Sequence, residues 1–293
     1  MHPPFRRTAL LQALFVTLLW SSSWVLIKVG LEAIPALTFA GLRYALAALL
    51  LLPFALHGGL LGTLRALGAR ERLELVALGI VLYALTQGAQ FVALSLLPAA
   101  TVSLVLSFTP VLVAGFATAT LRERLTRRQW LGVGLAAAGA LVYFGGAAWP
   151  DGRWAGLAVA LVGLVANALA AVLGRAVARR GTLRPLDVTA CSMGVGAALL
   201  LATGVAVQGL PSLDAQALAI VAWLATVNTA LAFVLWNRSL RGLSATEASV
   251  VNNTMLVQIA LLALLVLHEP ITMSGWAGIA LVVVGTLAVQ VRR

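Results

Sequence analysis

Two stretches of the chain resemble each other at a distance of 146 residues, about half of its 293 residues. The first, residues 121–142, reads LRERLTRRQWLGVGLAAAGALV, and the second, residues 267–288, reads LHEPITMSGWAGIALVVVGTLA. The matching pairs are Glu123 and Glu269, Thr126 and Thr272, Trp130 and Trp276, Gly132 and Gly278, and Gly139 and Gly285. Such self-similarity predicts a chain built from two copies of one repeat, residues 1–148 and 149–293.

Composition indicates the environment in which these copies fold. The chain is 61% hydrophobic and 10% charged, whereas a soluble domain carries about 25% charged residues. Apolar runs of about 20 residues, long enough to cross a bilayer, recur along the whole length. We therefore expect an all-α integral membrane protein with ten transmembrane helices, five in each copy. The spans are predicted at residues 8–29, 35–56, 75–97, 99–121, 129–148, 154–175, 185–207, 215–236, 245–267 and 274–291.

The basic residues predict the orientation of these spans. All of the 20 lysines and arginines except Lys28, Arg43 and Arg153 fall on one side. The positive-inside rule makes that side cytoplasmic and places both termini there. The turn at Glu123 carries four arginines and its mate at Glu269 carries none. Since five spans per copy is an odd number, the second copy is expected to be inverted, as in many secondary transporters with a substrate site near the midplane.

Other classes of function find little support in the sequence. The single cysteine, Cys191, can form no internal disulfide and has no partner for a metal site. His2, His57 and His268 lie far apart, and only His268 adjoins a carboxylate. We therefore expect no enzyme, cofactor or metal, and without an aromatic-interleaved basic patch we expect no nucleic-acid partner. The expected partners are the lipid bilayer and a small-molecule substrate, bound by a protein that functions as a monomer.

Polar side chains inside apolar spans are candidates for a substrate cavity, because hydrocarbon penalises them. Four pairs occupy equivalent positions of the two copies: Ser21 and Asn167, Tyr83 and Thr229, Ser103 and Ser249, and Ser107 and Asn253. Tyr83, Gln87 and Gln90 form one helical stripe. Two interpretations remain open, interhelical hydrogen bonding and cavity lining. The candidate substrate-binding residues are Trp20, Ser21, Trp24, Tyr83, Gln87, Ser103, Ser107, Asn167, Thr229, Ser249 and Asn253.

Aromatic and charged residues in the spans also allow two interpretations each. Trp20 and Trp24 are walls for an apolar part of the substrate or pack against the second helix. Arg43 meets a substrate carboxylate or backbone carbonyl, or it snorkels along its flexible stem to the external surface in a structural role. The nine acidic residues all lie at span ends or in loops. Their positions argue against the small four-helix drug pumps, which rely on an intramembrane carboxylate, and leave the energy coupling unassigned.

The turns of the repeated motif predict local structure. Thr126 and Thr272 are expected to cap the helices that follow them, and Thr126 with Gln129 matches a capping box. We interpret Glu123 and Glu269 as parts of structural turns. The repeated glycines are expected to allow close helix contact. The sequence does not locate a discontinuous helix of the kind that binds substrates in other transporters.

Three sequence segments resemble the EamA family of the drug/metabolite transporter superfamily. The resemblance rests on LLWSSSWVLIKVGL (residues 18–31), FAGLRYALAALLL (residues 39–51) and the repeated L-x-E-x-[LI]-T-x-x-x-W-x-G pattern. It implies ten helices in two inverted five-helix repeats, around a central cavity formed mainly by helices one, three, four, six, eight and nine. Nothing at Thr189 or Ala190 matches Arg43 in the second copy.

The resemblance also implies a function. Family members export amino acids and other small metabolites, and the chain looks most like the bacterial aromatic amino-acid exporter branch. We expect an alternating-access exporter of aromatic and other neutral amino acids in the bacterial inner membrane. The alternative is a carrier for drugs or another metabolite class such as nucleotide sugars. A phosphate-bearing substrate favours several cationic side chains, and Arg43 alone is a candidate.

Overall fold

The computed structural model describes residues 3–121, 126–145, 153–239, 243 and 245–290. These residues form helices and short connections. The helices are α1 (Pro3–Gly30), α2 (Ala36–His57), α3 (Leu60–Ala66), α4 (Ala69–Gly79), η1 (Ile80–Gln87), α5 (Gly88–Leu96), α6 (Ala99–Leu106), α7 (Thr109–Leu121), α8 (Arg127–Gly145), α9 (Arg153–Arg180), α10 (Pro185–Gln208), α11 (Ala215–Ala225), η2 (Thr226–Leu231), α12 (Ala232–Ser239), α13 (Ala245–Val266) and α14 (Met273–Gln290).

Six of the helical segments are long and apolar enough to cross a membrane. They are Arg7–Gly30, Ala36–His57, Ala69–Leu96, Arg153–Ala178, Pro185–Gln208 and Ala215–Trp236. They correspond to predicted spans one, two, three, six, seven and eight. Three shorter apolar helices, Ala99–Val113, Thr254–Val266 and Met273–Ala288, fall within predicted spans four, nine and ten. Helix α8 lies in predicted span five.

The chain divides into two compact units, and each unit takes residues from both sequence copies. Unit 1 comprises Met1–Val25, Leu96–Leu157 and Leu231–Arg293. Unit 2 comprises Leu26–Ser95 and Ala158–Ala230. Repeat-equivalent helices therefore fall in the same unit, with α8 and α14 in unit 1 and α2 and α10 in unit 2.

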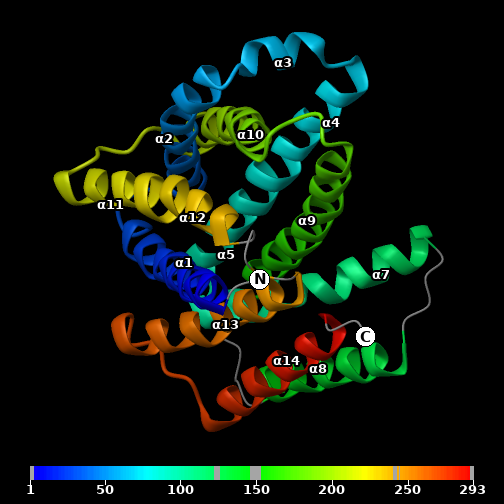
Figure 1. Cartoon of the computed structure of the whole chain (residues 1–293). Helices are drawn as coiled ribbons and strands as arrows, with labels where there is room; N and C mark the ends of the chain where they lie inside the picture. The colour runs from blue at the N-terminus through cyan, green and yellow to red at the C-terminus, as the bar shows by residue number, and fades with distance from the viewer. Residues whose placement is uncertain (1–2, 122–125, 146–152, 240–242, 244, 291–293) are drawn as a thin grey trace. The chain divides into compact units, whose positions relative to one another are not determined.

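In unit 1 the equivalent helices α8 and α14 lie side by side (Figure 1). A Cβ atom at Gly139 would lie 2.7 Å from the carbonyl oxygen of Gly278, and one at Gly285 would lie 2.6 Å from that of Gly132. Residue numbers rise along α8 as those of their partners fall along α14, so the two helices are antiparallel. Gly139, Gly278 and Gly285 thus allow the close helix contact predicted for the motif glycines.

In unit 2 the equivalent helices α2 and α10 pack in the same way. A Cβ atom at Gly41 would lie 2.5 Å from the Cα atom of Leu201, and one at Gly204 would lie 2.5 Å from the backbone nitrogen of Thr38. These contacts again run in opposite directions along the two helices. Both units are therefore built around an antiparallel pair of repeat-equivalent helices.

The predicted caps of α8 and α14 are confirmed. The backbone N–H of Thr126 donates to Gln129 Oε1 at 2.9 Å, and the backbone N–H of Gln129 donates to Thr126 Oγ1 at 3.3 Å. In the second copy the backbone N–H of Gly275 donates to Thr272 Oγ1 at 3.0 Å. Each bond satisfies a donor that the first turn of a helix leaves without a partner.

Two π-helical segments interrupt the α-helices of unit 2, and they begin 146 residues apart, at Ile80 and Thr226. A threonine hydroxyl in each segment donates to the carbonyl five residues earlier. Thr86 Oγ1 donates to Val81 O and Thr229 Oγ1 donates to Leu224 O, both at 2.8 Å. Such segments are rare and frequently lie at functional sites.

The helix predicted at residues 99–121 is broken into α6 and α7. Pro110 has no N–H to donate to the carbonyl of Leu106, and its ring clashes with a continuous helix. The hydroxyl of Thr109 donates a hydrogen bond to that carbonyl instead, with Oγ1 2.7 Å from Leu106 O. The discontinuity that the sequence analysis did not locate therefore lies at Ser107–Phe108.

Replacement of Gly139 by alanine tests the α8–α14 contact. The new Cβ would meet the backbone of Gly278, so we expect a loss of about 1–3 kcal/mol of stability, typical of overpacking. Gly134 lies on the same helix, and a Cβ there would meet nothing within 4 Å. In detergent, Gly139→Ala should lower the midpoint of thermal unfolding by at least about 3 °C, while Gly134→Ala should not. Equal midpoints for the two variants would contradict the contact.

Candidate functional site

Unit 2 contains a buried polar cluster around two neighbouring residues of α2, Arg43 and Tyr44. Arg43 Nε donates to Thr229 Oγ1 of η2 at 3.1 Å, and the guanidinium carbon lies 5.1 Å from the centre of the Tyr44 ring. The Tyr44 hydroxyl donates to Gln87 Oε1 of η1 at 2.6 Å. The rings of Tyr44 and Tyr83 meet edge to face at 5.5 Å. We call these five residues the Arg43 cluster.

The structure corrects the interpretation of Arg43 as a residue that snorkels to the surface. Its side chain is 5% exposed and turns toward Thr229 instead of following the helix out to its end. The hydroxyl of Thr229 and the face of Tyr44 provide local interactions for the guanidinium that the sequence did not reveal. Arg43 is thus a deeply placed cation of unit 2.

The Arg43 cluster brings together three of the predicted site residues. Tyr83 and Thr229 occupy equivalent positions of the two copies, and Gln87 lies one helical turn after Tyr83. They meet through Arg43 and Tyr44, which contact η2 and η1 respectively. Glycines allow this packing, since a Cβ at Gly196 of α10 would meet both the carbonyl of Gly79 and the Cβ of Tyr83.

Unit 1 contains a second polar network, centred on Gln258 of α13. Its Oε1 accepts from Ser21 Oγ at 2.9 Å, and its Nε2 donates to Thr17 Oγ1 at 3.2 Å and Thr254 Oγ1 at 3.1 Å. Both hydrogens of the amide are used. Ser21, predicted as a cavity residue, is fully buried and joins α1 to α13. Ser21 therefore forms an interhelical hydrogen bond, as one of its two interpretations predicts.

The two tryptophans of α1 both belong to unit 1 and differ in their surroundings. The Trp20 ring lies 5.7 Å from that of Phe233 and 5.2 Å from that of Trp236, so it is part of an aromatic cluster with α12. Trp24 is 7% exposed. Trp20 therefore packs against aromatic side chains of α12.

The remaining predicted site residues lie in α6, directly after α6, in α9 and in α13. Ser103 and Ser107 donate to carbonyls of their own helix, Ala100 O at 2.9 Å and Leu104 O at 2.7 Å. Asn167 is partly buried in α9. Ser249 and Asn253 belong to α13, but their side chains lie outside the described residues.

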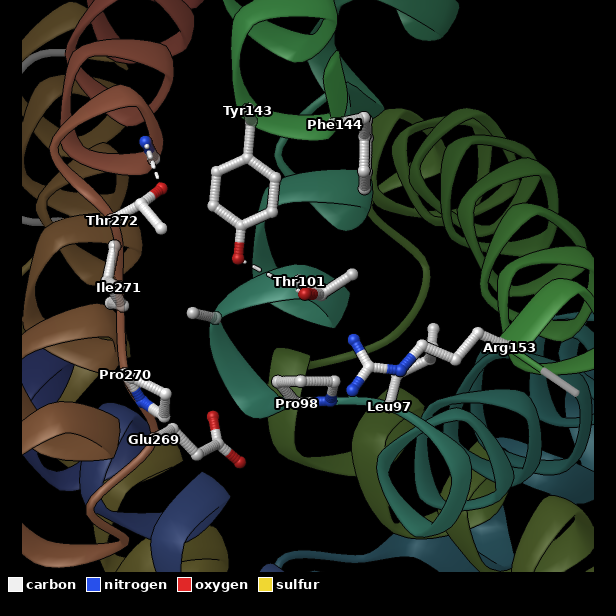
Figure 2. Close-up of a pocket in the computed structure, with 12 residues that line it drawn as sticks. Leu97, Pro98, Thr101, Tyr143, Phe144, Arg153, Glu269, Pro270, Ile271 and Thr272 are labelled. Carbon is white, nitrogen blue, oxygen red and sulfur yellow. Dashed lines mark hydrogen bonds between the residues drawn. The ribbon is translucent and has the colours of Figure 1, made fainter. Parts of the chain in front are cut away.

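A small pocket of about 120 Å³ lies at the start of α6 in unit 1. Glu269 accepts the backbone N–H of Ala99 with both carboxylate oxygens, at 3.2 and 2.8 Å. Thr101 Oγ1 and the Tyr143 hydroxyl are hydrogen-bonded at 3.1 Å. Figure 2 shows this pair and, in the same view, Glu269 and Arg153 on opposite sides of Pro98.

The contacts of Glu269 support the structural role predicted for its turn, because a carboxylate at a helix start satisfies backbone N–H groups. Its mate, Glu123, lies outside the described residues. Within the ranges that the structure describes, no three His, Cys, Asp or Glu side chains gather in a way that could hold a metal ion.

Comparison with known proteins places this architecture in a family. The EamA-like transporter family matches the chain twice, over residues 7–145 and 154–290. The chain belongs to the EamA-like transporter family. It is therefore a multi-pass membrane protein made of two EamA repeats, and the repeat predicted from the 146-residue offset is confirmed.

Two further similarities cover nearly the whole EamA chain. It is 28% identical to "Uncharacterized transporter YvbV" of Bacillus subtilis (strain 168), over 99% of this chain and 93% of that protein. A crystal structure shares its fold with a TM-score of 0.68 and 23% identity, covering 97% of each chain. The aromatic amino-acid exporter branch is not distinguished by these similarities.

Sequence reasoning missed three features of this EamA protein. Gln258 is a polar residue inside a predicted span, and Tyr44 directly follows Arg43, so both carried a readable signal. Pro110 after Thr109 signalled the helix break. None of the three has an identical residue in the other copy, so the repeat alone does not single them out.

Replacement of Gln258 by methionine tests the unit 1 network. Methionine keeps a similar length but removes three hydrogen bonds, so we expect a loss of about 1–2 kcal/mol, since such bonds contribute about 0.6 kcal/mol each and at most about 1.7. Gln90→Met is the matched control, because Gln90 makes no hydrogen bond within the described ranges. Thermal unfolding in detergent should separate the two variants, and equal midpoints would show that the network adds nothing to stability.

Proposed function

We propose that this protein is a secondary transporter that exports amino acids, aromatic and other neutral ones, and related small metabolites by alternating access. The observation that carries the proposal is the antiparallel packing of repeat-equivalent helices. In unit 1 the contact of Gly139 with Gly278 maps onto that of Gly285 with Gly132 when the two copies are exchanged. Two copies related in this way differ by a two-fold rotation that reverses helix direction.

An inverted pair of repeats supports a carrier mechanism. When the two copies exchange conformations, the same contacts can form in a state open to one side of the membrane and in a state open to the other. This exchange is the basis of alternating access. The pair α2 and α10 in unit 2 supports the same relation. Ten spans, an inverted second repeat and both termini on the cytoplasmic side of a bacterial inner membrane belong to this proposal.

The Arg43 cluster supports a substrate site in unit 2. It includes residues of both π-helical segments, and such segments are frequently found at functional sites. Its members Tyr83, Gln87 and Thr229 belong to this proposed site. The other candidates for substrate binding are Asn167 in unit 2 and Trp20, Ser21, Trp24, Ser103, Ser107, Ser249 and Asn253 in unit 1. A carrier for nucleotide sugars is a weaker proposal, since a diphosphate favours more than one cationic partner.

Counterflow in liposomes tests the transport proposal. Purified protein is reconstituted, one unlabelled amino acid is loaded inside, and the same amino acid carrying a label is supplied outside. Phenylalanine, methionine and threonine are tested in turn. We expect saturable uptake of label that depends on the internal load, because a carrier exchanges solutes across one alternating site.

Gln87→Ala should weaken this counterflow about tenfold or more through the lost polar contact, while Gln90→Ala in the same apolar segment, Ala69–Leu96, should leave it unchanged. The two glutamines lie three residues apart, so the pair separates a local contact from a general effect on the helix. Absence of counterflow for all three amino acids would overturn amino-acid transport. Uptake that does not saturate would indicate a channel.

Cysteine accessibility tests the inversion. Arg127 and Met273 are equivalent, exposed first residues of α8 and α14. In a Cys191→Ala background, Arg127→Cys should react with an impermeant maleimide only after the membrane is opened. Met273→Cys should react in intact spheroplasts, because the second copy is inverted. Labelling of both residues from the same side would overturn the inverted topology.

A further inference from the structure

Arg43 is a cation inside an apolar helix whose hydrogen-bonding capacity is only partly used. It is the eighth residue of α2, about 10 Å along the axis from the start of the helix. A guanidinium has five N–H donors. Among the described residues its Nε alone donates a hydrogen bond, to Thr229 Oγ1, and the Nη atoms donate none. Ionisable groups at such depth are usually paired, and those that are not mark solute pathways.

The acidic residues of unit 2 do not neutralise this cation. They are Glu32, Glu71, Glu74, Asp187 and Asp214, and all lie in turns or in the first two turns of helices. The ion pairs that involve them are with Arg70, Arg180 and Arg184. Within the part of the chain that the structure describes, no carboxylate lies within 4.0 Å of Arg43, so the cluster carries a net positive charge.

The neighbours of Arg43 add a second donor and apolar walls. The Tyr44 hydroxyl donates to Gln87 Oε1, so the amide nitrogen of Gln87 remains a donor without a hydrogen-bonded acceptor among the described residues. Tyr44 and Tyr83 present aromatic rings beside these donors. The guanidinium of Arg43 and the amide N–H₂ group of Gln87 can donate hydrogen bonds to a carboxylate, and the two aromatic rings can pack against an apolar group attached to it.

We propose that Arg43 binds the carboxylate of the transported solute, with Gln87 as a second donor and with Tyr44 and Tyr83 beside its apolar part. This inference rests on the proposed function as a carrier of small organic solutes and specifies the group that the carrier recognises. A single guanidinium matches one carboxylate. The cluster contains no anion for an ammonium group, so the ammonium of an amino acid is not required for binding at this site.

The position of Arg43 also connects solute binding to the π-helical segments. Arg43 contacts η2 through Thr229, and Tyr44 contacts η1 through Gln87. A carboxylate on the Nη atoms and on Gln87 would therefore touch, through single side chains, equivalent segments of both copies. This is the arrangement expected of a group whose occupation is sensed by both repeats.

Competition for counterflow tests the proposal in the reconstituted full-length protein. Labelled phenylalanine is competed with 3-phenylpropionate, which keeps the carboxylate and lacks the ammonium, and with phenylalaninamide, which lacks the carboxylate. We expect 3-phenylpropionate to compete and phenylalaninamide to be weaker by about 10- to 100-fold, the effect of a hydrogen-bonded charge. Equal competition by the two compounds would overturn the proposal and leave the carrier function intact.

Variants separate binding by Arg43 from a structural role. Arg43→Gln should remove the difference between 3-phenylpropionate and phenylalaninamide, Arg43→Lys should retain part of it, and Thr229→Val should keep it because the charge remains. Arg70→Gln, a surface residue, is the control. If Arg43→Gln does not fold, Arg43→Lys and Thr229→Val still decide. A change of both affinities by the same factor in these variants would make Arg43 structural.

A binding measurement separates failure of this proposal from failure of the transport proposal. In detergent, 3-phenylpropionate should raise the thermal midpoint of the wild-type protein and phenylalaninamide should not, because only a bound ligand stabilises the folded state. This shift without counterflow would reject the carrier and retain the carboxylate site. Counterflow without a preference for the carboxylate would retain the carrier and reject the carboxylate site. Absence of both the shift and the counterflow would overturn both proposals.

Discussion

The fold depends on the close antiparallel approach of repeat-equivalent helices. In lipid there is little hydrophobic force between helices, so association relies on van der Waals contact and on interhelical hydrogen bonds. Glycines supply that contact twice, between α8 and α14 in unit 1 and between α2 and α10 in unit 2. Each compact unit therefore contains parts of both copies.

The polar side chains buried among these helices differ in how many of their donors form hydrogen bonds. Gln258 joins α1 to α13 with its amide hydrogens fully used, which is how a structural amide behaves in an apolar environment. Arg43 differs, because among the described residues only its Nε donates a hydrogen bond and its Nη atoms donate none. This contrast is the basis for the proposal that the first network stabilises the fold and the second binds the solute. Pro110 shows a third solution, in which a threonine hydroxyl replaces a missing backbone donor.

Much of the architecture could be predicted because its signals are local or periodic. The 146-residue offset predicted the two copies, and the hydropathy predicted the six helical segments that are long and apolar enough to cross a membrane. The threonines at 126 and 272 predicted the helix starts. The candidate site residues have different surroundings. Tyr83, Gln87 and Thr229 belong to one cluster, connected through Arg43 and Tyr44, whereas Ser21 donates to Gln258 and Ser103 and Ser107 donate within their own helix.

The sequence by itself determined the class of protein, the number of copies and the glycines that bring helices together, because hydrophobicity and side-chain size act at each position independently. Only the tertiary structure decided which polar groups meet. Arg43 and Thr229 are 186 residues apart, and Ser21 and Gln258 are 237 apart. The faces that α2, η2, α1 and α13 present to one another follow from helix rotation and packing, which no periodic signal in one helix specifies.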